Sequence, residues 1–411
     1  MSPVRRKILL FVVIMLGLAS MIVFLRMGNS PAASVTPTVT VYLTSTSTFT
    51  PALIPEIIPI EDSPLKRSIL AAGDYLVRQQ LPNGELSYQV DFITNERAYS
   101  PSYMRLIAGT GSLFTVCRVS DDLKYCEAGD KALDHYLEFL VSDPENFTGT
   151  CLYTNGNCQL GGAAVTVDAI YKRWQATGDF ILKDRNLLTT AIDLGYFIVS
   201  MRRSDGGFFH SFDPHLAGTV DNDYFVINYP GESLFALMQL YEMTGNDFWL
   251  TQAHEVNTYM LTQPIAEDQW HGYAFGMFAR LDELTKVDQD YAKQIADVII
   301  AGQVRSLNPT NTSISTATKI ESLAALAQAF YLSGADHAWL DSEIRTFITF
   351  VSARQLPENN CGWDVNNDTM LSYNGGIFSN CEESSIRIDG IQHYINGVTV
   401  YLEYQSMIKA K

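Results

Sequence analysis

Apolar residues recur at three- and four-residue spacings in twelve windows of the chain, and strand-like alternation is confined to short stretches between them. This spacing places apolar side chains along one face of a helix. The sequence therefore predicts an all-α protein. The twelve helices are expected at 63–80, 102–119, 122–141, 161–177, 183–202, 230–244, 247–262, 269–285, 289–304, 316–332, 339–353 and 388–407.

The links between these helices alternate in length. Short links such as "ATGD" and "MTGND" follow even-numbered helices, with a glycine to end one helix and an acidic residue to cap the next. Most links after odd-numbered helices, such as "SMRRSDGGFFHSFDP", are long and rich in glycine, polar and aromatic residues. If short and long links alternate, the long links lie on one face of the molecule.

The even-numbered helices are rich in small residues and apolar nearly all round, as helices packed on several sides must be. Two of them, "GESLFALMQLYEMTG" and "IESLAALAQAFYLSG", are similar enough to count as an internal repeat. We expect an (α/α)6 toroid of six helical hairpins, with even helices in an inner ring and odd helices in an outer ring. An α-solenoid is the alternative, but it would show a fixed short period.

The N-terminal segment has a different character. Three basic residues precede an uncharged apolar run at 8–25, which is just long enough to span a bilayer and predicts a cytoplasmic N-terminus. A cleaved signal peptide, which would give a secreted protein, is the alternative. Both place the rest of the chain outside the cytoplasm. The expected parts are a membrane anchor or signal at 1–27, a Ser/Thr/Pro-rich linker at 28–60 and the toroid domain at 61–411.

Acidic residues dominate the charged positions. The chain has 45 acidic and 28 basic residues, of which one acidic and four basic residues belong to 1–60. Such a domain repels phosphate backbones, so nucleic acid is excluded as a partner. The same charge disfavours a polyanionic saccharide unless a local arginine cluster offsets it.

Six cysteines in an exported chain predict disulfides. A zinc site is the weaker alternative because no Cys-x-x-Cys or His-Cys cluster is present. We expect no metal ion and no other cofactor; calcium at Asp221 and Asp223 is a weak alternative, because the rest of a calcium-ligand pattern is missing. The expected pairs are Cys151–Cys158 across a tight turn, Cys361–Cys381 around a long loop and Cys117–Cys126 between two helices.

Three phrases carry a resemblance to a known family. "RQQLPNGELSY", "YSPSYMRLIAGTGSLF" and "NYPGESLFALMQLYEMTGNDFWL" resemble the six-hairpin glycosidase-like proteins, and the last is also similar to the C-terminal domain of glucuronyl C5-epimerases. The resemblance covers most of 62–405 in architecture but only these phrases in detail. It implies an (α/α)6 toroid that acts on a carbohydrate. No catalytic motif matches closely enough to transfer residue roles.

Candidate catalytic residues follow from position alone, because long loops and inner-helix N-termini should face the cavity of a toroid. Glu232 and Glu321 stand at matching points of two inner helices and could form an acid–base pair. Stabilisation of the helix N-terminus is the structural alternative for Glu232. Asp223 and His271 are the other two catalytic candidates.

Substrate-binding candidates are polar and aromatic residues in the same regions. Arginine could bind a carboxylate, and aromatic rings could stack on a sugar; ion pairing, turn formation and packing are the structural alternatives. The candidates are Tyr88, Arg97, Arg105, Asp168, His210, Asp213, Tyr229, Trp270, Trp363, Tyr373, Asp389 and His393.

Together these features predict an extracytoplasmic carbohydrate-active enzyme. Glycoside hydrolysis leads uronate epimerisation because the domain is acidic; the order reverses if Arg97 and Arg105 line the cavity. The alternatives are an inert toroid that binds glycan or protein, and a terpenoid-cyclase-like toroid, to whose Asp-rich motif "VDND" is a poor match. The absence of GxSxG, HExxH and nucleotide-binding motifs disfavours serine hydrolase, zincin and nucleotide-dependent chemistry.

Overall fold

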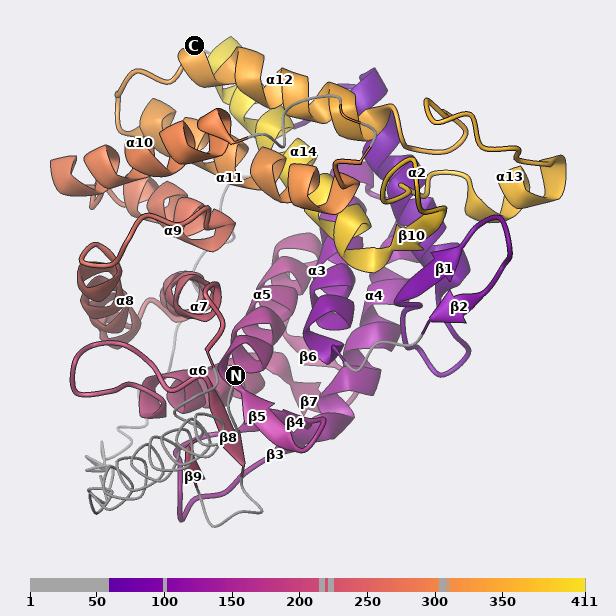
Figure 1. Ribbon diagram of the computed structural model, residues 1–411. Helices are drawn as coiled ribbons and strands as arrows, with labels where there is room; N and C mark the ends of the chain where they lie inside the picture. The colour runs from indigo at the N-terminus through magenta and orange to yellow at the C-terminus, as the bar shows by residue number, and fades with distance from the viewer. Residues whose placement is uncertain are drawn as a thin grey trace, which may run out of the picture. The chain divides into compact units, whose positions relative to one another are not determined.

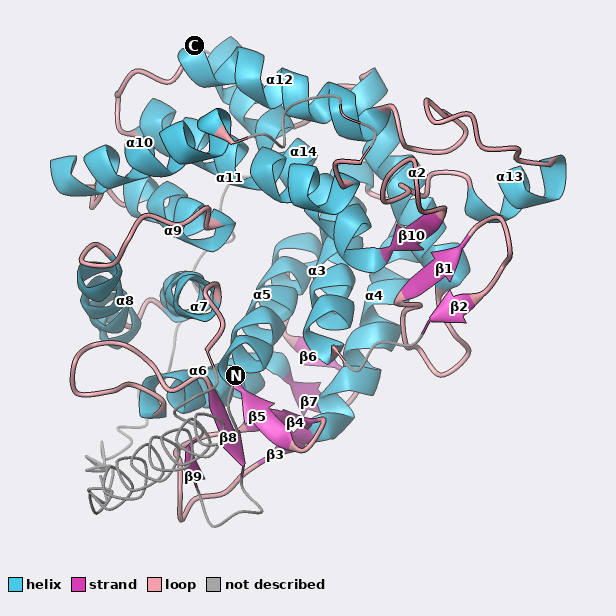
Figure 2. Ribbon diagram, viewed as in Figure 1, coloured by secondary structure: helices cyan, strands magenta, loops and turns pink. Residues whose placement is uncertain are grey.

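The computed structural model describes residues 59–98, 102–213, 219–220, 225–302, 308 and 310–410. All of them belong to one compact unit, Thr46–Lys411. Twelve long helices of this unit alternate along the chain between two rings (Figures 1 and 2). The outer helices are α2 (Pro64–Gln79), α4 (Leu123–Tyr136), α6 (Leu187–Ser200), α8 (Asp247–Met260), α10 (Lys286–Ala301) and α12 (Trp339–Ser352). The inner helices are α3 (Tyr103–Ser120), α5 (Leu160–Thr177), α7 (Tyr229–Thr244), α9 (Gln269–Arg280), α11 (Ser313–Leu332) and α14 (Ile388–Ala410).

The inner helices form a closed ring. Each packs on the next in the order α3, α5, α7, α9, α11 and α14, and α14 packs back on α3. Figure 1 shows them around a common axis, with the outer helices outside. The predicted (α/α)6 toroid is therefore confirmed for the described chain, and the solenoid alternative is wrong because a solenoid has no such closure.

Burial explains why the inner helices lack a polar face. α11 buries every residue from 319 to 330, whereas α2 buries only a stripe at three- and four-residue spacings. Small residues let the inner helices approach closely. A Cβ on Gly397 of α14 would lie 2.7 Å from the backbone nitrogen of Glu321 on α11, so only glycine fits this crossing.

Turn chemistry sets the helix ends. Gly178 and Gly245, from the phrases "ATGD" and "MTGND", end α5 and α7 with φ of +79° and +62°. Asn246 then caps α8 by accepting a hydrogen bond from the backbone N–H of Phe248. The glycine stops are therefore as the sequence predicts, but the predicted acidic caps are wrong, because Asn246 caps α8 and Asn186 caps α6.

The described residues form ten short strands, of which eight lie in the long links and two, β6 and β7, lie in the link between α5 and α6 that the sequence predicts to be short. They form three antiparallel sheets in the orders β10-β1-β2, β3-β4-β5-β8-β9 and β6-β7, and β1 pairs with β10 so that Val90 faces Ile386. The link before α3 is thereby joined to the link before α14. The strands are β1 (Gln89–Asp91), β2 (Arg97–Ala98), β3 (Leu140–Val141), β4 (Cys151–Thr154), β5 (Asn157–Gln159), β6 (Ile181–Leu182), β7 (Arg185–Asn186), β8 (Ser211–Asp213), β9 (Thr219–Val220) and β10 (Ser385–Arg387).

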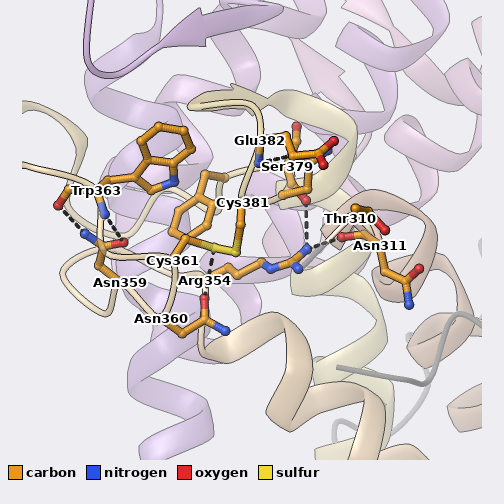
Figure 3. Close-up of a disulfide and its surroundings, with 12 residues drawn as sticks. Thr310, Asn311, Arg354, Asn359, Asn360, Cys361, Trp363, Ser379, Cys381 and Glu382 are labelled. Atoms are coloured by element: carbon orange, nitrogen blue, oxygen red, sulfur yellow. Dashed lines mark hydrogen bonds between the residues drawn. A yellow bond between two sulfur atoms is a disulfide. The ribbon is translucent and has the colours of Figure 1, made fainter. Parts of the chain in front are cut away.

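The loop between α12 and α14 contains a short helix, α13 (Asn367–Tyr373), and is pinned by a disulfide. Figure 3 shows Arg354 beside the Cys361–Cys381 bond. The buried guanidinium of Arg354 donates to the backbone oxygens of Asn311 and Ser379, the latter at 3.0 Å. A single buried cation thus ties this loop to the start of α11.

All three predicted disulfides are present: Cys117–Cys126, Cys151–Cys158 and Cys361–Cys381. None of the helices in the described ranges is both long and apolar enough to cross a membrane. The predicted anchor at 8–25 and most of the linker at 28–60 lie outside the described residues.

Candidate active site

A cavity of about 500 Å³, which we call the front cavity, lies at the N-terminal ends of the six inner helices. Each inner helix contributes to its wall, as expected if the long links lie on one face. Six of the predicted site residues line it: Arg105, Tyr229, Glu232, Trp270, Asp389 and His393.

Glu232 lies in the first turn of α7 with its side chain buried. Gly161 on α5 leaves the space that Glu232 Oε2 fills, because any Cβ there would overlap this oxygen. Oε2 has no hydrogen-bond partner among the described residues. Burial, followed by the nearby carboxylates of Asp268 and Asp168, raises the pKa of Glu232 to about 8. Glu232 is therefore protonated at neutral pH, as a proton donor must be.

The carboxylate of Asp268 lies close to Glu232 and also caps a helix. It caps α9 by accepting a hydrogen bond from the backbone N–H of Trp270 at 3.0 Å. Its burial raises its own pKa to about 7, which the cap bonds oppose. The glycine before Glu232, Gly231, gives Asp268 room, because a Cβ there would overlap its carboxylate.

Two arginines converge on Asp389 at the cavity wall. Arg387 Nε donates to Asp389 Oδ1 at 2.7 Å, and Arg105 Nε lies 3.2 Å from Oδ2. Both guanidinium groups also sit near the ring of Tyr88, at 5.8 and 5.9 Å from its centroid, and its hydroxyl accepts from Arg105 Nη1 at 3.0 Å. One carboxylate thus orients two cations, leaving an excess positive charge suited to an anionic ligand group.

His393 is held by two neighbours. Its Nδ1 lies 2.6 Å from Glu321 Oε2, and its Nε2 lies 3.2 Å from the amide nitrogen of Gln392. The carboxylate requires a proton on Nδ1, so the neutral ring carries its lone pair on Nε2, where the Gln392 amide can donate. Glu321 Oε1 in turn accepts from the Tyr273 hydroxyl at 2.7 Å. His393 is thereby oriented as a base on the cavity wall.

The four predicted catalytic residues have different positions. Only Glu232 lines the front cavity; Glu321 lies behind His393 and does not face Glu232 as a partner. His271 is buried, donates from Nε2 to Asn257 Oδ1 at 2.8 Å, and is not among the lining residues. Burial lowers the pKa of His271 to about 3, so this ring is neutral. Asp223 lies outside the described residues.

Three of the predicted binding residues support the cavity from behind. Tyr88 holds Arg105, as described above. His210 Nδ1 accepts a hydrogen bond from the backbone N–H of Val226, which lines the cavity. Asp168 lies deeper along the ring axis, where it accepts from Lys172 at 2.7 Å and from Gln239 at 2.8 Å.

The remaining four predicted binding residues are not brought to the front cavity. Arg97 is exposed on β2 and donates to Ser87 and Gln79. Asp213 ends β8. Trp363 packs edge-on against Phe92, and the Tyr373 hydroxyl donates to Asn95. The contacts of Arg97, Trp363 and Tyr373 are therefore structural.

Several polar residues that line the front cavity are not among those predicted from the sequence. The most important is Arg387, which stands only two residues before Asp389 and could have been found from that spacing. Gln159 and Gln269 precede or open inner helices, as the chosen candidates do, and the same positional rule applied to amides would have found them. Within the described ranges, no three His, Cys, Asp or Glu side chains are grouped to hold a metal ion.

No family model and no curated protein matches the sequence. Solved structures do match in fold. An unsaturated glucuronyl hydrolase of a Bacillus species is 13% identical, with a TM-score of 0.55 over 81% of this chain and 96% of its own. A cellobiose 2-epimerase of Spirochaeta thermophila is 13% identical (TM-score 0.58; 84% and 97%), and a cellulase of C. cellulolyticum is 9% identical (0.56; 84% and 99%). These neighbours are six-hairpin (α/α)6 toroids, and this chain shares their fold.

Proposed function

We propose that this protein is a carbohydrate-active enzyme that hydrolyses a glycosidic bond of a saccharide bearing a carboxylate. The observation that carries the proposal is a protonated, unpartnered carboxyl, Glu232, in the same cavity as Arg105 and Arg387. The fold neighbours support it, since they include a glucuronyl hydrolase responsible for glycosaminoglycan degradation.

In the proposed reaction, Arg105 and Arg387 bind the sugar carboxylate through their remaining N–H groups. Glu232 transfers its proton to the glycosidic oxygen as the bond between that oxygen and the anomeric carbon breaks. Water attaches to the anomeric carbon and gives its proton to His393 Nε2. Glu232 then regains a proton and His393 loses one, so that each cycle consumes one water molecule.

The arginines also answer the objection that an acidic domain disfavours uronates. Of the two arginines that were predicted to favour a uronate if they lined the cavity, Arg105 lines it and Arg97 does not. Arg387 supplies the second arginine instead. A carboxylated sugar therefore fits the site. Hydrolysis remains the leading reaction because the glycosidic oxygen must gain a proton as it leaves, and Glu232 is a protonated carboxyl that can supply it.

Uronate epimerisation is the second candidate, favoured by the orientation of His393. The Nε2 lone pair of His393 could exchange its hydrogen bond from Gln392 for the proton on the carbon next to the sugar carboxylate. The two arginines would stabilise the charge that moves onto that carboxylate. Glu232 would return a proton on the opposite face. Cellobiose 2-epimerases among the fold neighbours support this alternative.

One experiment separates these reactions. The protein is incubated with uronate-containing oligosaccharides, and with neutral cello-oligosaccharides as comparators, in ¹⁸O-labelled water and separately in deuterium oxide. Hydrolysis gives new reducing ends that carry ¹⁸O. Epimerisation leaves the chain length intact and introduces deuterium on carbon. Binding without either label would contradict both reactions and support the inert glycan-binding toroid.

We further propose that the domain works outside the cytoplasm, held by the apolar segment at 8–25. Three disulfides support this location because such bonds persist in oxidising compartments. Protease added to intact cells should digest the domain if it is exposed, and protection of the full-length chain until lysis would contradict surface exposure.

A further inference from the structure

The wall of the front cavity is divided between charged and neutral polar side chains. Apart from Glu232, its acidic and basic side chains come from α3, β10 and α14: Arg105, Arg387, Asp389 and His393. The segments that lead into α5 and α7 instead contribute three amides: Asn155, Gln159 and Asn228. Since α7 and α14 are opposite members of the six-helix ring, Asn228 lies across the cavity from the charged group on α14.

Asn228 is the N-cap residue of α7, yet its side chain does not cap the helix. Asparagine is preferred at this position because its side-chain oxygen usually accepts a hydrogen bond from the first helical turn. Asn246 does so at the start of α8, where it accepts from the backbone N–H of Phe248 at 3.0 Å. Asn228 is instead half-buried and lines the cavity. Helix capping therefore does not explain the amide at this position.

Asn228 lies one helical turn further out along α7 than the proposed proton donor. The backbone N–H of Glu232 donates to the carbonyl oxygen of Asn228 at 2.9 Å. The two residues are four apart and share one face of the helix. One turn rises about 5.4 Å, which is comparable to the length of one sugar ring in a chain. A sugar that contacts Asn228 is therefore the direct neighbour of the bond that Glu232 protonates.

The chemistry of an amide favours a neutral sugar at this position. An amide offers an acceptor oxygen and two N–H donors without a net charge, so it can exchange hydrogen bonds with a hydroxyl group in either direction. Asn155, at the exposed turn between β4 and β5, lines the same side of the cavity. Arg105 and Arg387, which suit a carboxylate, lie on α3 and just before α14. The cavity volume of about 500 Å³ is in the range that holds a ligand larger than a monosaccharide.

We propose that Asn228 binds a hydroxyl group of a neutral sugar on the leaving side of the bond that Glu232 protonates. The carboxylated sugar then lies against Arg105 and Arg387, and its neutral neighbour lies against Asn228. The substrate class is thereby narrowed to a uronate linked to a neutral sugar. This inference rests on the hydrolysis proposed above, to which it adds a residue that contacts the substrate and sets specificity without transferring a proton.

The test compares the binding of two sugars by isothermal titration calorimetry. The probes are methyl glucuronide and cellobiouronic acid, in which glucuronate is linked to glucose. Every protein carries Glu232→Gln, so that bound sugar is not cleaved. The disaccharide should bind more tightly than methyl glucuronide. Adding Asn228→Ala should weaken binding of the disaccharide about fivefold and leave that of methyl glucuronide nearly unchanged, as expected for the loss of one neutral hydrogen bond.

Asn246→Ala is the matched control, because it removes an asparagine that does cap its helix. It should lower the urea midpoint of unfolding and leave both affinities unchanged. Asn228→Ala should do the reverse, since no cap hydrogen bond is lost. A lower urea midpoint in Asn228→Ala, with no selective loss of disaccharide binding, would show that this residue acts as a cap and would overturn the proposal.

The remaining outcomes separate this subsite from the proposed function. If neither sugar binds, the proposed function fails and the subsite fails with it. If both sugars bind but Asn228→Ala affects them equally or not at all, the subsite alone is wrong. A crystal of Glu232→Gln with bound cellobiouronic acid checks the location directly. Glucose within hydrogen-bond distance of Asn228 supports the proposal, and glucose placed elsewhere contradicts it.

Discussion

At the residue scale, the candidate chemistry depends on one carboxyl group kept neutral and another paired with two arginines. Glu232 Oε2 has no hydrogen-bond partner among the described residues, and the pKa of this carboxyl is raised. Asp389 accepts a hydrogen bond from Arg387 and forms an ion pair with Arg105. Both line the same cavity. The environment of each group, more than its residue type, therefore decides its role.

We expect Glu232→Gln to reduce kcat on the identified substrate by about 10²–10⁴-fold, because an amide cannot supply the proton. In the wild-type protein, activity should fall as the pH rises through about 8, where Glu232 ionises. A pH–rate profile measures this basic limb. A variant that keeps near-wild-type kcat would remove Glu232 from the mechanism.

The same substitution should change the pH dependence of stability. Folding raises the pKa of Glu232 from 4.5 to about 8, so its contribution is complete below pH 4.5 and is lost as pH rises through 8. Glutamine does not titrate. We therefore expect the unfolding free energy of Glu232→Gln to rise relative to that of the wild type between pH 5 and pH 9. Urea denaturation of both proteins measures the difference. A constant difference across this range would show that Glu232 is not shifted.

The arginine pair predicts a selective loss of binding. Arg105→Ala should raise KM for a carboxylated saccharide by roughly 10–100-fold, since hydrogen bonds to charged groups contribute about 1.5–3 kcal/mol. Binding of a neutral saccharide should change little. Arg97→Ala is the matched control, because Arg97 is exposed and does not line the cavity. Equal effects of the two substitutions would contradict a carboxylate subsite.

At the element scale, the position of a side chain along its helix decides whether it reaches the front cavity. Glu232 is the fourth residue of α7, which begins at Tyr229, whereas Glu321 is the ninth of α11, which begins at Ser313. At about 1.5 Å per residue, Glu321 lies roughly 7 Å deeper along its helix. The similarity of the two phrases suggests that Glu232 and Glu321 lie at equal depth along their helices. They do not, because each helix begins at its own cap and the caps lie outside the repeat.

Glu321 therefore acts through His393, and Tyr273 on α9 fixes it there. Tyr273→Phe removes the hydrogen bond to Glu321 Oε1 and should lower kcat about tenfold with little change in KM. A purely structural defect would instead lower the unfolding free energy, which urea denaturation measures. Tyr171→Phe removes a hydroxyl bonded to Glu242 on α7 and is the control. An equal loss of kcat in the control would refute the link to His393.

Most helices could be predicted because their apolar periodicity is local. The exceptions reflect local competition. α9 ends at Arg280 and α10 begins at Lys286, because Thr285 and Asp288 form a capping box that starts the new helix early. α4 ends at Tyr136, and the residues predicted to extend it form a short 3₁₀ turn and β3.

At the scale of the whole molecule, sequence could predict the toroid but only part of the site. Arg105, Arg387 and Asp389 come from opposite ends of the described chain and meet only because α14 closes against α3. No local pattern encodes that meeting. Gln392 could not be foreseen either, since its role depends on which nitrogen of His393 faces it.

The disulfides predict a large response to reduction. They join cysteines 7, 9 and 20 residues apart, and loops of this size stabilise by about 2–3 kcal/mol each. Full reduction should therefore lower Tm by roughly 10 °C or more. Thermal unfolding with and without reductant measures this, with mass spectrometry of alkylated thiols to count the bonds opened. An unchanged Tm after complete reduction would contradict the prediction.

The pairing of β1 with β10 and the packing of α14 between α3 and α11 also bear on the order of events in synthesis. The inner ring lacks one of its six members until α14 has left the ribosome. Contacts between the two ends of a chain form slowly because they close a long loop. Earlier hairpins can form as they emerge, but a complete ring cannot. Closure of the inner ring therefore follows the synthesis of α14, and the earlier hairpins must wait for it to complete their packing.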